Sequence, residues 1–177
     1  MTTGMELDES KQKHPNIRNV DELPPFTIDR GSRFGATVRR LAFPAGAQDI
    51  GATHYEVAPG RTAFPRHYHC GMEEGIFVLD GRGTLRIGER TIDVRAGDWV
   101  TLLPGPDHAH ELVNTGDAPL RYLCISTQAR ADIVGYPDSG KIAASASPGN
   151  DFFAKAWVRG IFRADSSVDY YDGEDEG

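Results

Sequence analysis

Two histidines and a glutamate lie close together between Gly60 and Gly81, and their side chains could bind a metal ion. His67 and His69 are two residues apart, so on a β-strand both side chains point to the same face. Glu74 follows after a short loop, where we expect the next strand to begin. Two imidazoles and one carboxylate that converge from adjacent strands form a ligand set typical of open first-row metal sites.

Because side chains alternate between the two faces of a strand, Glu74 and its neighbour Glu73 should point to opposite faces. Glu74 shares a strand face with Ile76 and Val78, which are apolar and suited to a protein interior. Glu73 lies on the opposite face with Phe77. We therefore expect the Glu74 carboxylate to point into the fold.

A second group of residues, further along the chain, could supply a third imidazole. His108 and His110 follow a glycine and proline turn, and His110 shares a strand face with Leu112 and Asn114. We expect His110 to be the additional ligand, with His108 as the alternative, and Asn114 to be a turn residue or a support for the ligands.

The segments that would position these residues are short and have the composition of β-strands. Turns rich in glycine and proline separate them, and this pattern predicts an all-β sandwich or barrel. No long segment keeps a 3.6-residue period, which argues against an α/β fold. The expected strands are residues 36–41, 50–58, 65–69, 75–79, 84–87, 91–94, 99–103, 110–113 and 120–127.

These residues resemble the two sequence motifs of the cupin superfamily. The first motif has the form G-x5-H-x-H-x3-4-E-x6-G, and its last spacing selects Glu74. The chain matches it, with one extra residue after the first glycine, at Gly60, His67, His69, Glu74 and Gly81. The second motif has the form G-x5-P-x-G-x2-H-x3-N, and the residues that correspond to it are Gly97, Pro104, Gly105, His110 and Asn114. The chain departs from it by one extra residue before Pro104, by the adjacent Pro104 and Gly105, and by a longer loop before His110. His108 fits the distance from Gly97 better, but His110 has the correct spacing to Asn114.

The resemblance covers about residues 50–127 and implies a cupin double-stranded β-helix, a jelly-roll barrel in a single domain. It also implies one divalent metal ion, held by His67, His69, Glu74 and His110, and commonly a homodimer. More loosely, the chain resembles small cupins that end in a Tyr-Pro-Asp-Ser-Gly-Lys loop and an acidic tail, some of which carry a sugar-phosphate isomerase label.

The expected organisation places the barrel between two extensions. Residues 1–34 would form an arm and an edge strand, residues 35–128 the cupin barrel, and residues 129–177 an extension that ends in an acidic tail. We expect residues 143–150, which are small and polar, to be mobile. Residues 151–163 fit either a short helix or two edge strands.

A divalent ion with three neutral imidazoles and one carboxylate keeps a net positive charge and one or two positions for water or substrate. Manganese, iron, zinc and nickel all suit these ligands, so the ion's identity stays open. We expect a small metalloenzyme acting on a small polar metabolite by isomerase, dioxygenase or lyase chemistry. The alternative is a non-catalytic small-molecule-binding or sensor cupin. Tyr55 and Tyr122 are candidates for lining the pocket, but no catalytic acid or base can be identified.

Composition restricts the class of protein further. The 177 residues carry a formal charge of −7, with a pI of about 5.3, which disfavours nucleic-acid binding because that requires a basic surface. Cys70 and Cys124 are the two cysteines, too few for a disulfide framework. The polar N-terminus and the absence of a long apolar run lead us to expect a cytoplasmic protein without a membrane segment.

Overall fold

The structure is a computed structural model that describes residues 14–148 and 156–174. Within these ranges the chain is built from antiparallel β-strands and short 3-10 turns, which confirms the predicted all-β class. No helix in the described part is long and apolar enough to cross a membrane. The strands are β1 (Phe26–Arg30), β2 (Phe34–Arg40), β3 (Ile50–Val57), β4 (Tyr68–His69), β5 (Glu74–Asp80), β6 (Arg82–Ile87), β7 (Arg90–Arg95), β8 (Trp99–Leu102), β9 (His110–Val113), β10 (Leu120–Thr127), β11 (Ala131–Tyr136), β12 (Lys141–Ala146) and β13 (Val158–Arg163).

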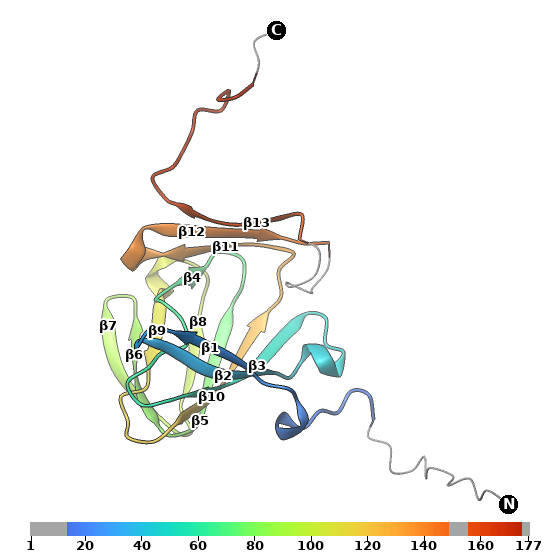
Figure 1. Cartoon of the computed structure of the whole chain (residues 1–177), viewed down its shortest axis with the longest axis vertical. Coiled ribbons are helices and arrows are strands. Elements are labelled where there is room, and N and C mark those ends of the chain that lie inside the picture. The colour runs from blue at the N-terminus through green and yellow to red at the C-terminus, as the bar shows by residue number, and fades with distance from the viewer. Residues whose placement is uncertain (1–13, 149–155, 175–177) are drawn as a thin grey trace, which may run out of the picture.

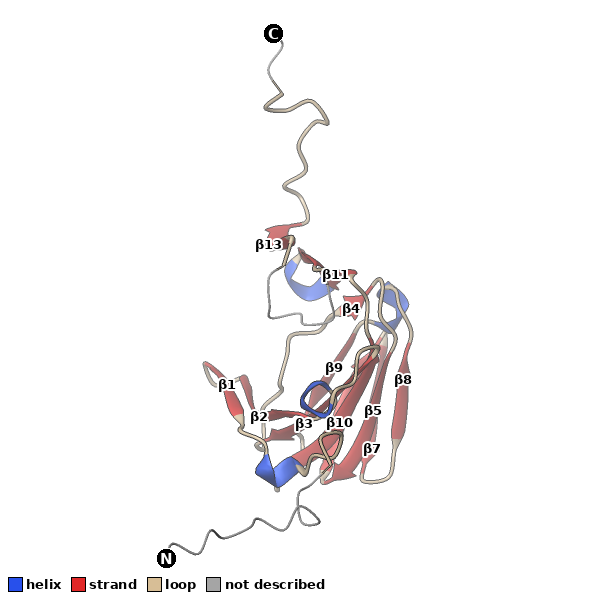
Figure 2. Ribbon diagram, turned by 90° about the vertical axis from the view of Figure 1, so that its right-hand side faces the viewer, coloured by secondary structure: helices blue, strands red, loops and turns tan. Residues whose placement is uncertain are grey.

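The barrel is formed by two sheets that pack face to face. One has the order β1-β2-β3-β10-β5-β8 and the other the order β7-β6-β9. Figure 2 shows β1 and β8, the two edge strands of the larger sheet, on opposite sides of the barrel. Their inner faces enclose one apolar core, because alternate residues of each strand point inward. The buried core residues are Ala36, Val38, Val57, Ala63, Ile76, Val78, Leu85, Val94, Leu102, Leu112, Leu120 and Tyr122.

The strand predictions for the barrel are confirmed at eight of the nine segments, with ends that shift by a few residues. The exception is the segment at 65–69, where only Tyr68 and His69 form a ladder strand. Pro65 has no amide hydrogen to donate to a ladder. His67 instead makes an isolated bridge with His110, in which each backbone amide donates to the carbonyl of the other residue.

A third sheet, with the order β13-β12-β11-β4, lies across one end of the barrel (Figure 1). Of residues 143–150, which we expected to be mobile, residues 143–146 belong to the paired strand β12. Alanine and serine have little intrinsic preference for strands, but β12 has hydrogen-bonded partners on both sides, and pairing overrides propensity. Residues 158–163 form a strand rather than a helix, while residues 149–155 lie outside the described ranges.

The chain before and after the barrel contributes strands of its own. β1 pairs only with β2 and is the expected short edge strand. β11 pairs with β4 through Val134 and His69, so the C-terminal extension is joined directly to a strand that carries a candidate ligand. The domain boundaries at 34 and 128 stay a prediction.

Asn114 closes the loop after β9 and is fully buried. Its side-chain amide donates to the carbonyls of Val57 and Ala118, at 2.7 and 2.9 Å, and its oxygen accepts from the amide of Gly116 at 2.9 Å. These three bonds tie the β9–β10 loop to the end of β3. Asn114 therefore supports a turn, as expected, and its side chain is fully engaged by the backbone.

Replacing Asn114 by alanine should destabilise the fold by about 2–3 kcal/mol, because buried backbone groups lose their partners. Chemical denaturation measures this change. Thr115→Ala is the matched control, because Thr115 is exposed and its hydroxyl contacts only the exposed Thr84 hydroxyl. Equal stability of the two variants would show that the amide of Asn114 does not hold the loop.

Candidate metal centre

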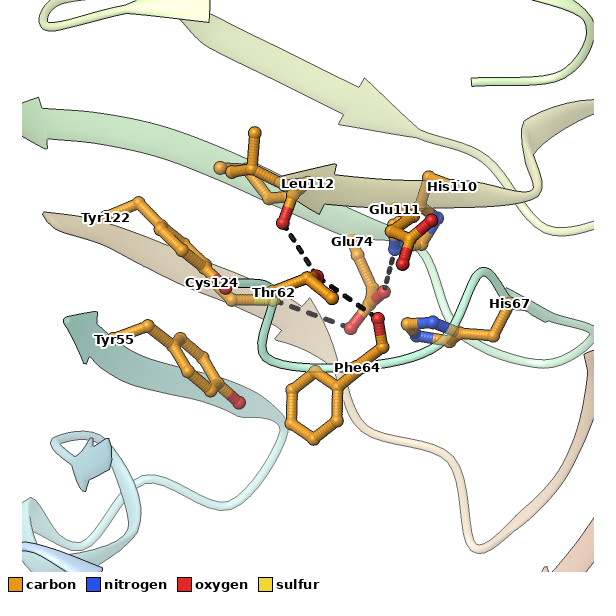
Figure 3. Close-up of a pocket in the computed structure, with 11 residues that line it drawn as sticks. Tyr55, Thr62, Phe64, His67, Glu74, His110, Glu111, Leu112, Tyr122 and Cys124 are labelled. Carbon is orange, nitrogen blue, oxygen red and sulfur yellow. Dashed lines mark hydrogen bonds and ion pairs between the residues drawn. The ribbon is translucent and has the colours of Figure 1, made fainter. Parts of the chain in front are cut away.

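Four side chains named from the sequence converge at the end of the barrel that β11–β13 cover. His67, His69 and Glu74 each offer a ligand atom, and these atoms lie within 4.8 Å of one another. His110 joins them, because its Nε2 lies 3.4 Å from the Glu74 oxygen Oε2. His69 Nε2 lies 3.4 Å from the same oxygen. Figure 3 shows Glu74 between His67 and His110.

Strand register explains why these residues meet. The bridge between His67 and His110 brings their rings to a centroid distance of 4.6 Å. Glu74 is the first residue of β5, on the inner face with Ile76 and Val78, while Glu73 is exposed. His108 lies outside the cluster, in the 3-10 turn that precedes β9.

The hydrogen bonds of the three imidazoles indicate which nitrogen carries the proton. Each Nδ1 faces an oxygen that can only accept, so Nδ1 carries a proton, and Nε2 is the nitrogen left for a further proton or a metal ion. These contacts are His67 to the carbonyl of Pro65 at 2.9 Å, His69 to the Asp132 carboxylate at 2.6 Å, and His110 to the carbonyl of His108 at 3.1 Å.

The electrostatics of the cluster favour a cation at its centre. Burial raises the pKa of Glu74, but a hydrogen bond with His110 and the nearby imidazoles outweigh it and lower the pKa to about 2. Burial and His110 lower the pKa of His67 to about 4, so this ring is neutral near pH 7. Imidazole lone pairs that face an ionised carboxylate repel it unless a proton or a metal ion lies between them. The donor set therefore fits a metal ion.

Asp132 holds His69 in place and was not identified from the sequence. Its side chain is 3% exposed, and it also accepts from the amide of Gly71 at 2.8 Å. Burial alone would lower the pKa of His69, but the hydrogen bond with Asp132 raises it above the ordinary value. Asp132 lies on β11, a strand that the sequence analysis missed, although the adjacent β-branched residues Ile133 and Val134 were a usable signal.

A small cavity of about 60 Å³ adjoins the cluster, with room for about two water molecules. Tyr55 and Tyr122 line it, as expected, and their rings stack at a centroid distance of 5.0 Å. Burial raises the pKa of both hydroxyls, so both stay protonated. Cys124 also lines it, with Sγ 3.5 Å from a Glu74 oxygen, and burial and this carboxylate raise the pKa of its thiol.

Comparison with known proteins agrees with the all-β fold described above. Residues 53–126 match a family model described as a cupin domain. An uncharacterized protein of Methanocaldococcus jannaschii is 28% identical over 107 residues, which are 60% of this chain and 81% of that relative.

Two solved structures show the same fold. One is a sugar phosphate isomerase from a cupin superfamily, from Silicibacter pomeroyi, with a TM-score of 0.71 and 22% identity over 87% of this chain and 96% of the other. The other, from Thermotoga maritima, is described as a predicted oxalate decarboxylase, with a TM-score of 0.56 and 22% identity over 63% of this chain and 97% of the other. At this identity the likeness concerns the fold alone.

Replacing Asp132 by asparagine should lower the pKa of His69 in the metal-free protein, because the ring loses the charge that stabilises its protonated form. In the wild type this pairing adds stability that is complete below pH 6.5 and is lost as the pH rises through the raised pKa. NMR titration of the imidazole measures the pKa.

Asp138→Asn is the matched control, since Asp138 follows the same strand but its carboxylate contacts Arg66 and Arg86. An unchanged His69 pKa in the Asp132 variant would contradict the assigned contact.

Proposed function

Residues 53–126 of this chain form a cupin domain, and from that premise we propose that the protein binds one divalent metal ion through His67, His69, Glu74 and His110. The observation that carries the proposal is the convergence of imidazoles on an ionised carboxylate, each with Nδ1 bonded to an acceptor, which leaves Nε2 for the ion. Such outer hydrogen bonds orient imidazole ligands of metals.

The donor set limits the identity of the ion without fixing it. Nitrogen ligands with one carboxylate suit manganese, iron, zinc and nickel. When bound, such an ion polarises carbonyl or hydroxyl groups and lowers the pKa of coordinated water. The protein's own side chains position the ligands and limit the space beside them. Asp132 fixes the ring of His69, and Tyr55 and Tyr122 line the small adjoining cavity.

We propose further that the protein is a small metalloenzyme that acts on a small polar metabolite, by isomerase, dioxygenase or lyase chemistry. The volume of about 60 Å³ beside the cluster admits only a small group of the ligand to the centre. The names of the two similar structures, an isomerase and a decarboxylase of small molecules, support this range of chemistry without selecting within it.

The second candidate function is a non-catalytic binding or sensor cupin. Its support is the state of the titratable groups around the small cavity. Of the described lining residues outside the cluster, Tyr55, Tyr122 and Cys124 have their pKa raised by burial, and Glu111 accepts two hydrogen bonds from Arg33 at 2.7 and 2.9 Å. The hydroxyls of Tyr55 and Tyr122 and the thiol of Cys124 therefore stay protonated near pH 7 and do not act as a base. Turnover of a small metabolite by the metal-loaded protein would decide for the enzyme.

We also propose a homodimer, as the family resemblance implies. The face of the third sheet that bears Ile133, Ile142 and Phe162 supports this, because their exposed fractions are 50%, 36% and 50%. Exposed apolar side chains gathered on one sheet face are typical of subunit contacts. The cytoplasmic location stays a prediction from the sequence.

Replacing His110 by alanine should weaken metal binding by more than about 100-fold, because losing only the hydrogen-bonding partner of a ligand already costs about 10–100-fold. Competition with a chromogenic chelator measures the affinity. His108→Ala is the control, because His108 contributes its backbone carbonyl to His110 and keeps it in the variant. If His108→Ala loses the metal and His110→Ala retains it, the wrong histidine has been chosen.

A further inference from the structure

The Tyr-Pro-Asp-Ser-Gly-Lys loop joins β11 to β12 and lies beside the metal centre. Tyr136 is the last residue of β11, and Lys141 is the first residue of β12. Because Gly135 pairs with Tyr68 in the antiparallel ladder, Tyr136 lies opposite the preceding residue, His67. The ring centroids of Tyr136 and His67 are 6.2 Å apart. The loop therefore begins with an aromatic side chain next to a candidate metal ligand.

The side chain of Tyr136 lies on the face of β11 that is directed toward the metal centre. Alternate residues of a strand share a face, so Tyr136 points to the same side as Asp132. Asp132 contacts His69, which identifies this side as the one toward the centre. Tyr136 is half-buried, and its hydroxyl makes no hydrogen bond to any residue that the structure describes. The hydroxyl is thus available to a ligand as a donor.

Lys141 brings a positive charge to the same face. It lies opposite Tyr136 in the ladder, and its Nζ is 5.3 Å from the centroid of the Tyr136 ring. Arg163 lies opposite Lys141 on the next strand, and like charges that face each other across strands are destabilising. Within residues 14–148 and 156–174, neither side chain forms an ion pair with a carboxylate. The Tyr136 ring attracts the ammonium group without neutralising it, so a bound anion would relieve the repulsion.

The carboxylate of the loop itself is engaged elsewhere. Asp138 accepts hydrogen bonds from Arg66 at 3.1 Å and from Arg86 at 2.8 Å. The Arg66 side chain is only 7% exposed, and Arg66 directly precedes His67. These contacts fasten the loop to the segment that carries a candidate metal ligand. Its two ends are therefore held in place before a ligand binds, which lowers the entropic cost of binding.

We propose that Tyr136 and Lys141 bind an anionic group of the ligand, a carboxylate or a phosphate, on the His67 side of the metal centre. The ammonium group of Lys141 supplies the charge, and the hydroxyl of Tyr136 donates a hydrogen bond to the same anionic group. This inference rests on the proposed function, because it places the anion relative to a metal ligand. It narrows the ligand class from small polar metabolites to small anionic ones.

Calorimetric titration of the full-length, metal-loaded protein with inorganic phosphate and, separately, with malonate tests the proposal at constant ionic strength. Lys141→Met should weaken binding of the tighter anion by about tenfold or more, because it removes the charge and keeps a long apolar side chain on the ring. Tyr136→Phe should weaken it by about threefold or more, because it removes one hydrogen bond and keeps the ring. The tighter anion distinguishes a phosphate from a carboxylate ligand.

Two control variants match these changes. Tyr68→Phe also removes a hydroxyl next to His67, but the Tyr68 ring packs against Gly135 on the opposite face of the sheet. Arg82→Gln also removes a positive charge, from a side chain that is 67% exposed at the start of β6, whereas Ile87 at the other end of β6 pairs with His110. Both controls should leave the anion affinities unchanged.

Metal content, measured for every variant, separates this proposal from the metal proposal. In metal-loaded protein, an anion affinity that Lys141→Met or Tyr136→Phe leaves unchanged, or that falls equally in the controls, overturns the anion site and leaves the metal proposal intact. A wild type that binds neither anion, or a loss of anion binding that appears only together with loss of the metal, also overturns it. Anion binding that depends on both side chains in a protein unable to hold metal supports the anion site and defeats the metal proposal.

Discussion

The structure depends on one constraint, which is that imidazole lone pairs and an ionised carboxylate must share a nearly buried space. Such groups are costly to bury unless each has a partner. On the outer side of the rings, the Nδ1 contacts to Pro65, Asp132 and His108 meet this need. On the inner side the three Nε2 atoms and Glu74 require a proton or a cation between them, and a divalent metal ion satisfies all four at once. The short β4, the bridge from His67 to His110 and the start of β5 are the backbone features that bring these groups together.

The C-terminal extension contributes a strand and a supporting side chain to this site. β11 pairs with β4, and through Asp132 it fixes the ring of His69. The same sheet face carries Ser145 of β12 and Arg159 of β13, because Asp132 pairs with Ser145 and Ser145 pairs with Arg159. Coupling of this kind means that a shift of β12 by one residue would turn Ser145 and its neighbours to the opposite face.

The barrel and the convergence of His67, His69 and Glu74 could be predicted from the sequence because local signals suffice there. Alternation in residues such as Ile76 and Val78, and glycine and proline at the turns, mark the strands, while the spacing of His67, His69 and Glu74 selects one face. The third sheet could not be predicted in the same way. β12 consists largely of alanine and serine, and what makes it a strand is pairing with β11 and β13, which local sequence does not report. The choice of His110 over His108 likewise depends on a long-range bridge to His67.

Elemental analysis by mass spectrometry, on protein purified without chelators or a metal-affinity tag, tests the central claim most directly. The account predicts close to one equivalent of manganese, iron, zinc or nickel per chain, and the metal found would choose between oxygen-dependent chemistry and isomerase or lyase chemistry. Absence of bound metal, even after the protein is incubated with each of the four ions in turn, would contradict the account. The cluster around Glu74 would then be a network of shared protons in a barrel that binds no metal.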